Sequence, residues 1–139
     1  MTAKQECEGL MNEVLPIAER MLREHGEFYP YGGYIDSEGK TVHVGAKEKG
    51  ADRPNSKFLV QFLKDTFRQR AKHGFYRATA IVFDAVVTHP DTDTQGDAIQ
   101  ICLDHQDDYS AQVFFPYKLI DGEPVYGPTF AQEGTHDIF

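Results

Sequence analysis

Three long β-patterned runs in the second half of the chain constrain its fold more than any other feature. The runs cover residues 75–89, 96–106 and 109–119. Val, Ile, Thr, Phe and Tyr are frequent in them, and the second and third alternate along the chain as half-buried strands do. The segments between them are short and polar, whereas a parallel pair of strands needs a crossover of a dozen residues or more. The three runs are therefore predicted to form an antiparallel meander.

Two amphipathic helices are predicted before the meander. Apolar residues recur at helical spacing in residues 4–25 and again in residues 56–73, and a glycine follows each segment as a natural stop. Asn55 or Ser56 can cap the second helix. Pro16 interrupts the first segment, because proline lacks an N–H and clashes with the preceding turn. We expect either a kink there or a helix that begins near Pro16.

The complete order of elements predicts the fold class. Between the helices, two extended runs flank the turn-forming residues 36–39, which indicates a hairpin. The last residues, after the meander, are expected to form an extended or irregular tail. We therefore predict an α+β fold in the order αββαβββ, with a single antiparallel sheet covered on one face by two helices. The 139 residues fit one domain, residues 1–139.

The charge of the chain excludes some partners. A formal net charge of -8 argues against a nucleic acid or an anionic membrane as partner, because both bind cationic surfaces. The charge is uneven: residues 57–77 carry six basic residues against Asp65, and residues 84–139 carry eleven carboxylates against Lys118. The simplest interpretation is that the two parts lie close together and screen each other. The alternative is a basic groove for an acidic partner.

The cellular location is also an expectation from composition. The first residues lack the apolar core of a signal peptide, and no stretch reaches the ~20 apolar residues that span a bilayer. The two cysteines, Cys7 and Cys102, are far apart in the sequence and have no metal-binding spacing. We expect a cytoplasmic protein with reduced thiols and no cofactor or metal.

The polar stretch THPDTDTQGD, residues 88–97, begins like a calcium-binding loop. Its acidic and amide residues and its glycine match the first half of an EF-hand loop, but the position of the closing glutamate is occupied by Cys102. The flanking segments are β-patterned, whereas an EF-hand requires helices. The stretch is therefore predicted to be a hairpin loop that contributes Asp91, Asp93 and Asp97 to the acidic half of the chain.

Few residues have the spacing of a catalytic or metal site. The six histidines show no metal-binding spacing, and no nucleophile motif is present. The cluster LDHQDD around His105 can be read as a metal site or, more simply, as a polar hairpin. Asp84 is the one acid in the apolar run IVFDAVV, so its pKa is expected to be raised if it is buried. Alternatively, Asp84 faces solvent from an uncovered side of the sheet.

Two similar aromatic-proline segments are the most unusual feature of the chain. They are FYPYGGY at residues 28–34 and FFPYK at residues 114–118. Proline in a strand is confined to edges and bulges, so each segment marks an interruption of pairing. If the two segments adjoin, an aromatic depression forms from their rings, namely Tyr29, Tyr31, Tyr34, Phe114 and Tyr117. The alternative is that these rings pack in the core and at the sheet edge.

Parts of the sequence resemble a group of small uncharacterised bacterial proteins. The resemblance covers roughly residues 24–118, through EFYPYGGYIDSEGKTVHVGA, AIVFDAVVTHP and DAIQICLDHQDDYSAQVFFPY. In that group, a segment similar to E-F-Y-P-F-G precedes an acidic hairpin, and a later strand contains a segment similar to F-x-P-Y. The resemblance implies a bacterial, cytosolic protein of one domain and implies no particular activity.

Two hypotheses about function follow. The first is a non-enzymatic protein-interaction module, a homodimer or the binder of a protein partner, in the manner of acidic inhibitors or immunity proteins of basic toxins. Its basis is the missing catalytic spacing together with the acidic second half. The second is a small-molecule-binding protein or enzyme that uses the aromatic depression, with Asp84 or His105 as acid or base.

Overall fold

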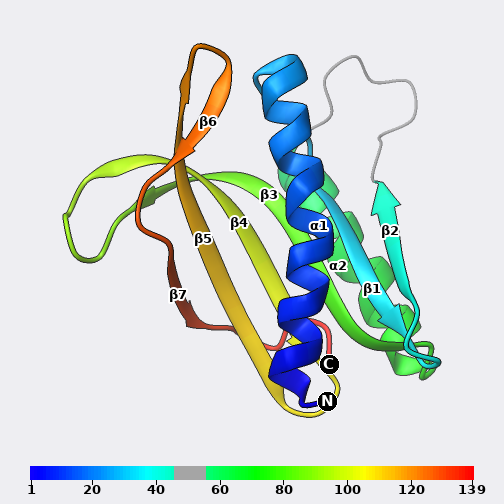
Figure 1. Ribbon diagram of the computed structural model, residues 1–139. Coiled ribbons are helices and arrows are strands. Elements are labelled where there is room, and N and C mark those ends of the chain that lie inside the picture. Colours follow the sequence, from blue (N-terminus) through cyan, green and yellow to red (C-terminus); the bar gives the residue numbers. More distant parts are fainter. Residues whose placement is uncertain (46–55) are drawn as a thin grey trace.

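A computed structural model describes residues 1–45 and 56–139 (Figure 1). Within them the chain forms two helices and seven strands. In chain order these are α1 (Ala3–His25), β1 (Tyr31–Asp36), β2 (Thr41–Gly45), α2 (Ser56–Lys72), β3 (Tyr76–Thr88), β4 (Gln95–His105), β5 (Tyr109–Ile120), β6 (Glu123–Tyr126) and β7 (Phe130–Glu133). The predicted cap at Asn55 lies outside the described residues.

All strands belong to one antiparallel sheet, which confirms the predicted α+β class. The order across the sheet is β2-β1-β3-β4-β5-β6, and β7 also pairs with β5. The predicted hairpin and meander are present as β1–β2 and β3–β4–β5. The tail, expected to be extended or irregular, instead supplies β6 and β7. These short strands pair with successive parts of the outer edge of β5.

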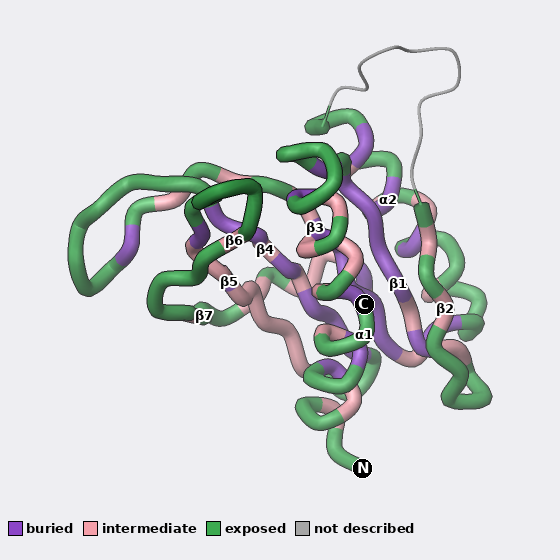
Figure 2. Tube along the Cα trace, turned by 45° about the horizontal axis from the view of Figure 1, so that its top comes forward, coloured by how far each residue is buried: buried purple, intermediate pink, exposed green. Residues whose placement is uncertain are grey.

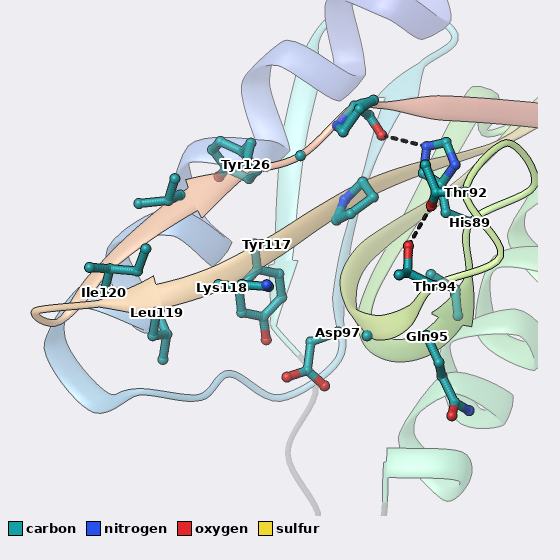
Figure 3. Close-up of a pocket in the computed structure, with 16 residues that line it drawn as sticks. His89, Thr92, Thr94, Gln95, Asp97, Tyr117, Lys118, Leu119, Ile120 and Tyr126 are labelled. Atoms are coloured by element: carbon teal, nitrogen blue, oxygen red, sulfur yellow. Dashed lines mark hydrogen bonds between the residues drawn. The ribbon is translucent and has the colours of Figure 1, made fainter.

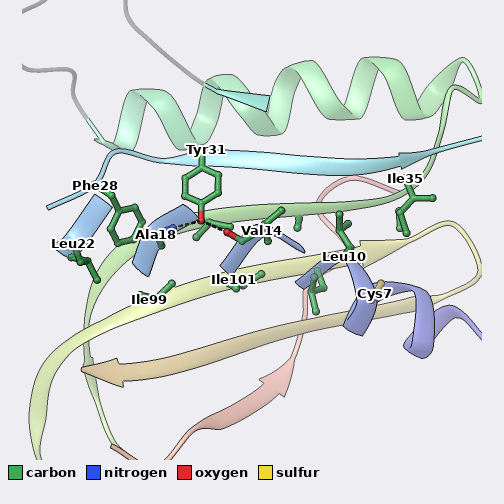
Figure 4. Packing of buried hydrophobic residues seen from close by; sticks show 14 of the residues in the cluster. Cys7, Leu10, Val14, Ala18, Leu22, Phe28, Tyr31, Ile35, Ile99 and Ile101 are labelled. Carbon is green, nitrogen blue, oxygen red and sulfur yellow. Dashed lines mark hydrogen bonds between the residues drawn. The ribbon is translucent and has the colours of Figure 1, made fainter. Parts of the chain in front are cut away.

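The helices lie on opposite faces of the sheet, so the prediction that both cover one face was wrong. Alternate residues of β3 separate into two cores: Ala80 and Val82 pack with α1, and Ile81 and Phe83 pack with α2. The physical reason is visible in the sequence, since the run AIVF, residues 80–83, is apolar at consecutive positions, as in strands that are buried on both faces. Figure 4 shows the core on the α1 side, with α2 beyond β1 on the other.

Helix α1 passes through Pro16 as one continuous helix that starts at Ala3, so it does not begin near Pro16. Thr2 and Gln5 form a capping box at its start. Close to Pro16, Tyr31 of β1 contacts the main chain of the helix. Its hydroxyl donates to the carbonyl of Val14 and accepts from the N–H of Ala18, two groups that a regular helix pairs with each other (Figure 4).

The adjacent glycines Gly32 and Gly33 allow both helices to lie close to β1. A Cβ atom at Gly32 would lie 2.7 Å from the carbonyl oxygen of Ala80 and 2.9 Å from the ring of Phe67 in α2. A Cβ atom at Gly33 would lie 2.8 Å from Val14 in α1. The close approach that these glycines permit is therefore used for packing the core, with one helix on each side.

The helices cover only part of the sheet. The first half of β3 is largely buried, whereas from Phe83 onward its residues alternate between intermediate and exposed (Figure 2). The first residues of β4, Gln95–Asp97, are also exposed. The β3–β4 and β5–β6 hairpins thus form a less covered end of the sheet. No helix among the described residues is long and apolar enough to cross a membrane.

Candidate functional site

The two aromatic-proline segments do not adjoin, so the predicted common depression does not form. Strands β3 and β4 lie between β1 and β5. Tyr31 is buried under α1, and Tyr34 stacks on Tyr76 in the α2 core with ring centroids 4.0 Å apart. Phe114 is buried and stacks on Phe130 of β7. Each segment instead borders a groove of its own.

The larger groove lies where β4 and β5 separate. These strands pair as far as Ala98 and Pro116, and beyond this point each pairs only with its own hairpin partner. The fork between the β3–β4 and β5–β6 hairpins encloses an open space of about 630 Å³, which we call the hairpin groove (Figure 3). Its lining includes Val87, His89, Thr92, Thr94–Asp97, Pro116–Ile120 and Val125–Pro128.

Pro116 sits at the base of this fork and explains part of its geometry. The carbonyl of Pro116 accepts from the N–H of Gly127, so the missing N–H of the proline faces the same outer edge of β5. Along that edge β5 pairs with β7 as far as Phe114 and with β6 from Tyr117 onward. The prediction that Pro116 marks interrupted pairing is confirmed on this edge, while pairing with β4 continues through Ala98.

The two walls of the hairpin groove differ in chemistry. The β3–β4 wall presents hydroxyl, amide and carboxylate groups from Thr92, Thr94, Gln95 and Asp97. The β5–β6 wall presents large apolar side chains that are well exposed, namely Leu119, Ile120, Val125 and Tyr126. A mainly polar hairpin with one lining carboxylate, Asp97, therefore lies across the fork from a mainly apolar hairpin that also carries Lys118 (Figure 3).

The buried His89 holds the β3–β4 loop in place. Its Nδ1 accepts from the N–H of Asp91, so the proton resides on Nε2, which donates to the carbonyl of Pro128 at 3.2 Å (Figure 3). The imidazole also packs edge-on against Phe130, with ring centroids 4.9 Å apart. The predicted hairpin loop is confirmed, and these long-range contacts join it to the segment between β6 and β7.

Asp84 and Tyr117 are brought together, although they lie two strands apart. Both project from the α1 face, and the Tyr117 hydroxyl donates to Asp84 at 2.9 Å across β4. Asp84 is exposed and does not line the groove. Partial burial raises the pKa of Asp84, and nearby Asp97 raises it further, while the Tyr117 hydrogen bond acts in the opposite direction. Burial and Asp84 both raise the pKa of Tyr117.

Helix α1 fixes the opposite wall through polar contacts. The Tyr126 hydroxyl donates to Glu19 at 2.7 Å, and Arg23 donates to Glu123 at 2.8 Å. Burial and the contact with Glu19 raise the pKa of Tyr126. The β6 strand is thus attached to α1, as the β3–β4 loop is attached through His89. Both walls of the groove are held by contacts from elsewhere in the fold.

A charge excess surrounds the hairpin groove. In residues 91–97 and 117–127, which border the groove, four exposed carboxylates form no ion pair with another described residue, namely Asp91, Asp93, Asp97 and Asp121. Among the described residues that line the groove, Lys118 is the one lysine or arginine. The basic segment does not form ion pairs with these four carboxylates. It pairs with the acidic half elsewhere, for example where Lys64 of α2 lies 3.0 Å from Asp137 in the tail.

The first aromatic-proline segment borders a second groove, of about 490 Å³, which we call the aromatic groove. It lies between the end of α1 and β2, and its lining comprises Ile17, Met21, His25, Glu27–Tyr31 and His43–Gly45. Tyr29 is 39% exposed there, while Tyr31 is fixed from behind by α1. Of the predicted depression, this groove keeps only these two tyrosines.

His105, a candidate acid or base, is fully buried in a structural network. Its Nδ1 accepts from the N–H of Asp107, and its Nε2 donates to Glu6 of α1 at 3.0 Å. Arg77 of β3 also contacts Glu6 at 3.0 Å. Burial alone would raise the pKa of Glu6, but the His105 and Arg77 hydrogen bonds lower it below its usual value. Both nitrogens of His105 are thus engaged in fastening α1 to the sheet.

The polar cluster at the end of β4 fastens the C-terminal tail. His136 donates from Nδ1 to buried Asp104 at 2.8 Å, and Ile138 donates its N–H to the same carboxylate at 2.9 Å. Burial raises the pKa of Asp104 despite these bonds. Ser110 donates to the carbonyl of Leu103, and the second nitrogen of His136 faces Asp108 at 3.3 Å. The Asp104–His136–Ser110 grouping therefore lacks the contact that would activate a serine nucleophile.

Neither a search for metal-binding clusters nor comparison with known proteins gives a further indication of function. Among the described residues, no three His, Cys, Asp or Glu side chains are grouped so that they could hold a metal ion. Comparison with protein-family models, curated proteins and solved structures gave no match. The site residues that sequence reasoning missed are mainly His89, Lys118 and Tyr126. Their roles depend on contacts made after folding, which no local pattern signals.

Proposed function

We propose that this protein is a non-enzymatic binding module that holds a basic, amphipathic segment of a partner protein in the hairpin groove. The observation that carries the proposal is the contrast between the two walls of the fork. A segment with cationic side chains on one side and apolar side chains on the other complements both walls simultaneously. Such a segment also fits the four unpaired carboxylates around the groove, which outnumber Lys118.

The shape of the fork favours an extended segment. Strands β4 and β5 diverge beyond Ala98 and Pro116, so neither provides a β partner for the other there. A strand entering this space can alternate its side chains between the two hairpin walls, as in peptide recognition by strand addition. Inhibition of a basic protein in a bacterial cytoplasm is a setting that suits this proposal, by analogy with other acidic inhibitors.

A short synthetic peptide of alternating lysine and leucine tests the proposal. We expect it to bind the full chain in isothermal titration, and we expect a peptide of alternating glutamate and leucine not to bind. Replacement of three carboxylates of the β3–β4 hairpin by amides, in D91N/D93N/D97N, should weaken binding by about tenfold or more.

A matched variant controls for net charge. Glu8, Glu24 and Asp107 are exposed and lie outside the lining of the groove, and E8Q/E24Q/D107N changes the net charge by the same amount. Its affinity for the lysine peptide should remain close to that of the original chain. Equal losses in the two variants, or equal binding of the two peptides, would reject the hairpin groove as the site.

The alternative function, a small-molecule binder or enzyme that uses Asp84 or His105, has no comparable support. Asp84 lies outside the lining of both grooves. His105 is buried and has both ring nitrogens occupied. A general acid or base must reach the proton that it transfers, and His105 has no such access.

A further inference from the structure

The described part of the sheet has two lateral edges, and only one is protected against pairing with another strand. On the β5 side, the outer strands are four residues long, β6 contains Glu123 and Pro124, and β7 ends at Glu133. Short strands, charges and proline at an edge all prevent further strand addition. At the opposite edge, β2 has the sequence TVHVG, with neither proline nor an acidic, lysine or arginine residue.

The pairing of β1 and β2 defines which groups of β2 point outward. The N–H of Asp36 donates to the carbonyl of Lys40 at the hairpin turn, so this pair is hydrogen-bonded. Hydrogen-bonded pairs alternate along an antiparallel ladder, and Val42 and Val44 therefore bond to β1. The N–H and carbonyl groups of the three remaining residues, Thr41, His43 and Gly45, face away from the sheet.

We infer that β2 is a dimerisation edge, on which β2 of a second copy of this chain pairs in antiparallel orientation. A two-fold axis beside His43 places His43 opposite its counterpart in the other copy. It also places Thr41 opposite Gly45 and Val42 opposite Val44. In this register the three outward N–H groups of each copy meet the three outward carbonyls of the other, so the strand is complementary to itself.

The distribution of charge favours a second copy as the occupant of this edge. The four unpaired carboxylates lie on the β3–β4 and β5–β6 hairpins, at the other end of the strand order from β2. Dimerisation through β2 therefore keeps these four carboxylates far from the contact. The acidic groups nearer to this edge are fewer: Glu13 of α1 lies 3.9 Å from His43, and Glu27 lines the aromatic groove.

Apolar surface borders the edge on both faces of the sheet. On the α1 face, the aromatic groove reaches β2 at His43 and Gly45 and contains the partly exposed Tyr29. On the other face, Val44 of β2 is only partly buried against the α2 core. Strand pairing at β2 brings these side chains toward a second copy and adds apolar contact to the main-chain bonds.

Sedimentation equilibrium of the full chain tests the inference directly. We expect a monomer–dimer equilibrium for the original chain. The dissociation constant of the dimer should be roughly 30-fold larger for His43→Pro, because proline removes an outward N–H from each copy. His43→Ala keeps this N–H and should remain a dimer. The bonds between β1 and β2 do not use the N–H of His43, so far-ultraviolet circular dichroism should show a folded His43→Pro chain.

A second variant and an independent readout cover the case in which His43→Pro fails to fold. His43→Glu keeps the main chain and places two carboxylates beside the axis, each close to Glu13 of its own copy, so it should also weaken the dimer. In the original chain, amide exchange at His43 should slow as the protein concentration rises. A monomer at every concentration, or a dimer that His43→Glu leaves unchanged, would overturn the inference. The result does not depend on the hairpin groove.

Discussion

Strand β3 passes through two different environments, and the contrast separates the stable part of the molecule from its candidate binding end. In its first half, Ala80, Ile81 and Val82 are buried between α1 and α2. In its second half, Asp84 and Val86 are exposed on the α1 face, beyond the cover of the helices. One half of β3 therefore belongs to the core, and the other half belongs to the β3–β4 hairpin that borders the hairpin groove.

The two ends also differ in what holds them. The covered end is stabilised by apolar burial, by the Glu6 network and by the C-terminal tail on Asp104. The projecting end depends on a few specific contacts, such as those of His89 and Tyr126. We therefore expect mutations at the covered end to lower stability, and mutations at the groove to weaken binding with little effect on stability.

The largest stability effect is expected in the covered sheet. Ile101 is fully buried between β3 and β5 under α1. Ile101→Ala should lower the free energy of unfolding by about 2 to 5 kcal/mol, because it removes buried methyl groups and leaves a cavity. Urea denaturation measures this change. A loss below about 1 kcal/mol would show that this part of the sheet is not the tightly packed core described here.

Tyr31→Phe should have the next largest effect. The Tyr31 hydroxyl provides a partner for the carbonyl of Val14 and the N–H of Ala18, both inside α1. Its removal should cost about 1 to 3 kcal/mol in unfolding free energy, because buried polar groups lose a hydrogen bond. Unchanged stability in thermal melting would mean that Val14 and Ala18 pair with each other once the hydroxyl is absent.

Glu6→Gln should destabilise the covered end in a pH-dependent manner. Because His105 and Arg77 lower the pKa of Glu6 in the folded chain, the ionised carboxylate stabilises the fold above the ordinary value of 4.5. That stabilisation is lost as the pH falls through the lowered folded pKa. The difference between the original chain and Glu6→Gln should be about 1 to 2 kcal/mol at pH 7 and should shrink in acid. Urea titrations at several pH values measure it, and a difference that grows in acid would contradict this role.

The smallest effects are expected at the projecting end of β3. Val86 is 66% exposed, so Val86→Ala should change the unfolding free energy by less than about 1 kcal/mol. Asp84→Asn should also be nearly neutral at pH 7, since Asp84 is exposed and an amide oxygen can still accept from Tyr117. Its raised pKa means that ionisation of Asp84 is mildly unfavourable in the fold, so the variant should not be less stable. A large loss of unfolding free energy in either variant would contradict the contrast in stability between the two ends of β3.

Much of the fold could be predicted from local patterns. Helical spacing, strand alternation and glycine at helix ends identified α1, α2 and five strands within the described residues. The error about the helix faces arose at residues 80–83, where four consecutive apolar residues indicate burial on both faces of the strand. Strands β6 and β7 were missed because four-residue strands carry almost no pattern, and they form by pairing with the edge of β5.

The site was less predictable than the fold. Asp84 lies in a period-two strand, and its exposure depends on where the cover of α1 ends, which no residue of β3 specifies. The sequence marked Pro116 and Tyr117 as part of an unusual segment, but their neighbour is the β3–β4 hairpin and not β1. The anchor His89 contacts Pro128, 39 residues away in the chain, and only the folded sheet brings them together.

The most direct test of the binding role is a map of amide shifts by nuclear magnetic resonance during titration with the lysine–leucine peptide. The hairpin groove predicts that the largest shifts fall in residues 91–97 and 117–127, and that the buried first half of β3 changes little. Shifts concentrated at residues 17–31 and 41–45, around the aromatic groove, would contradict it. So would small shifts spread evenly over all exposed carboxylates.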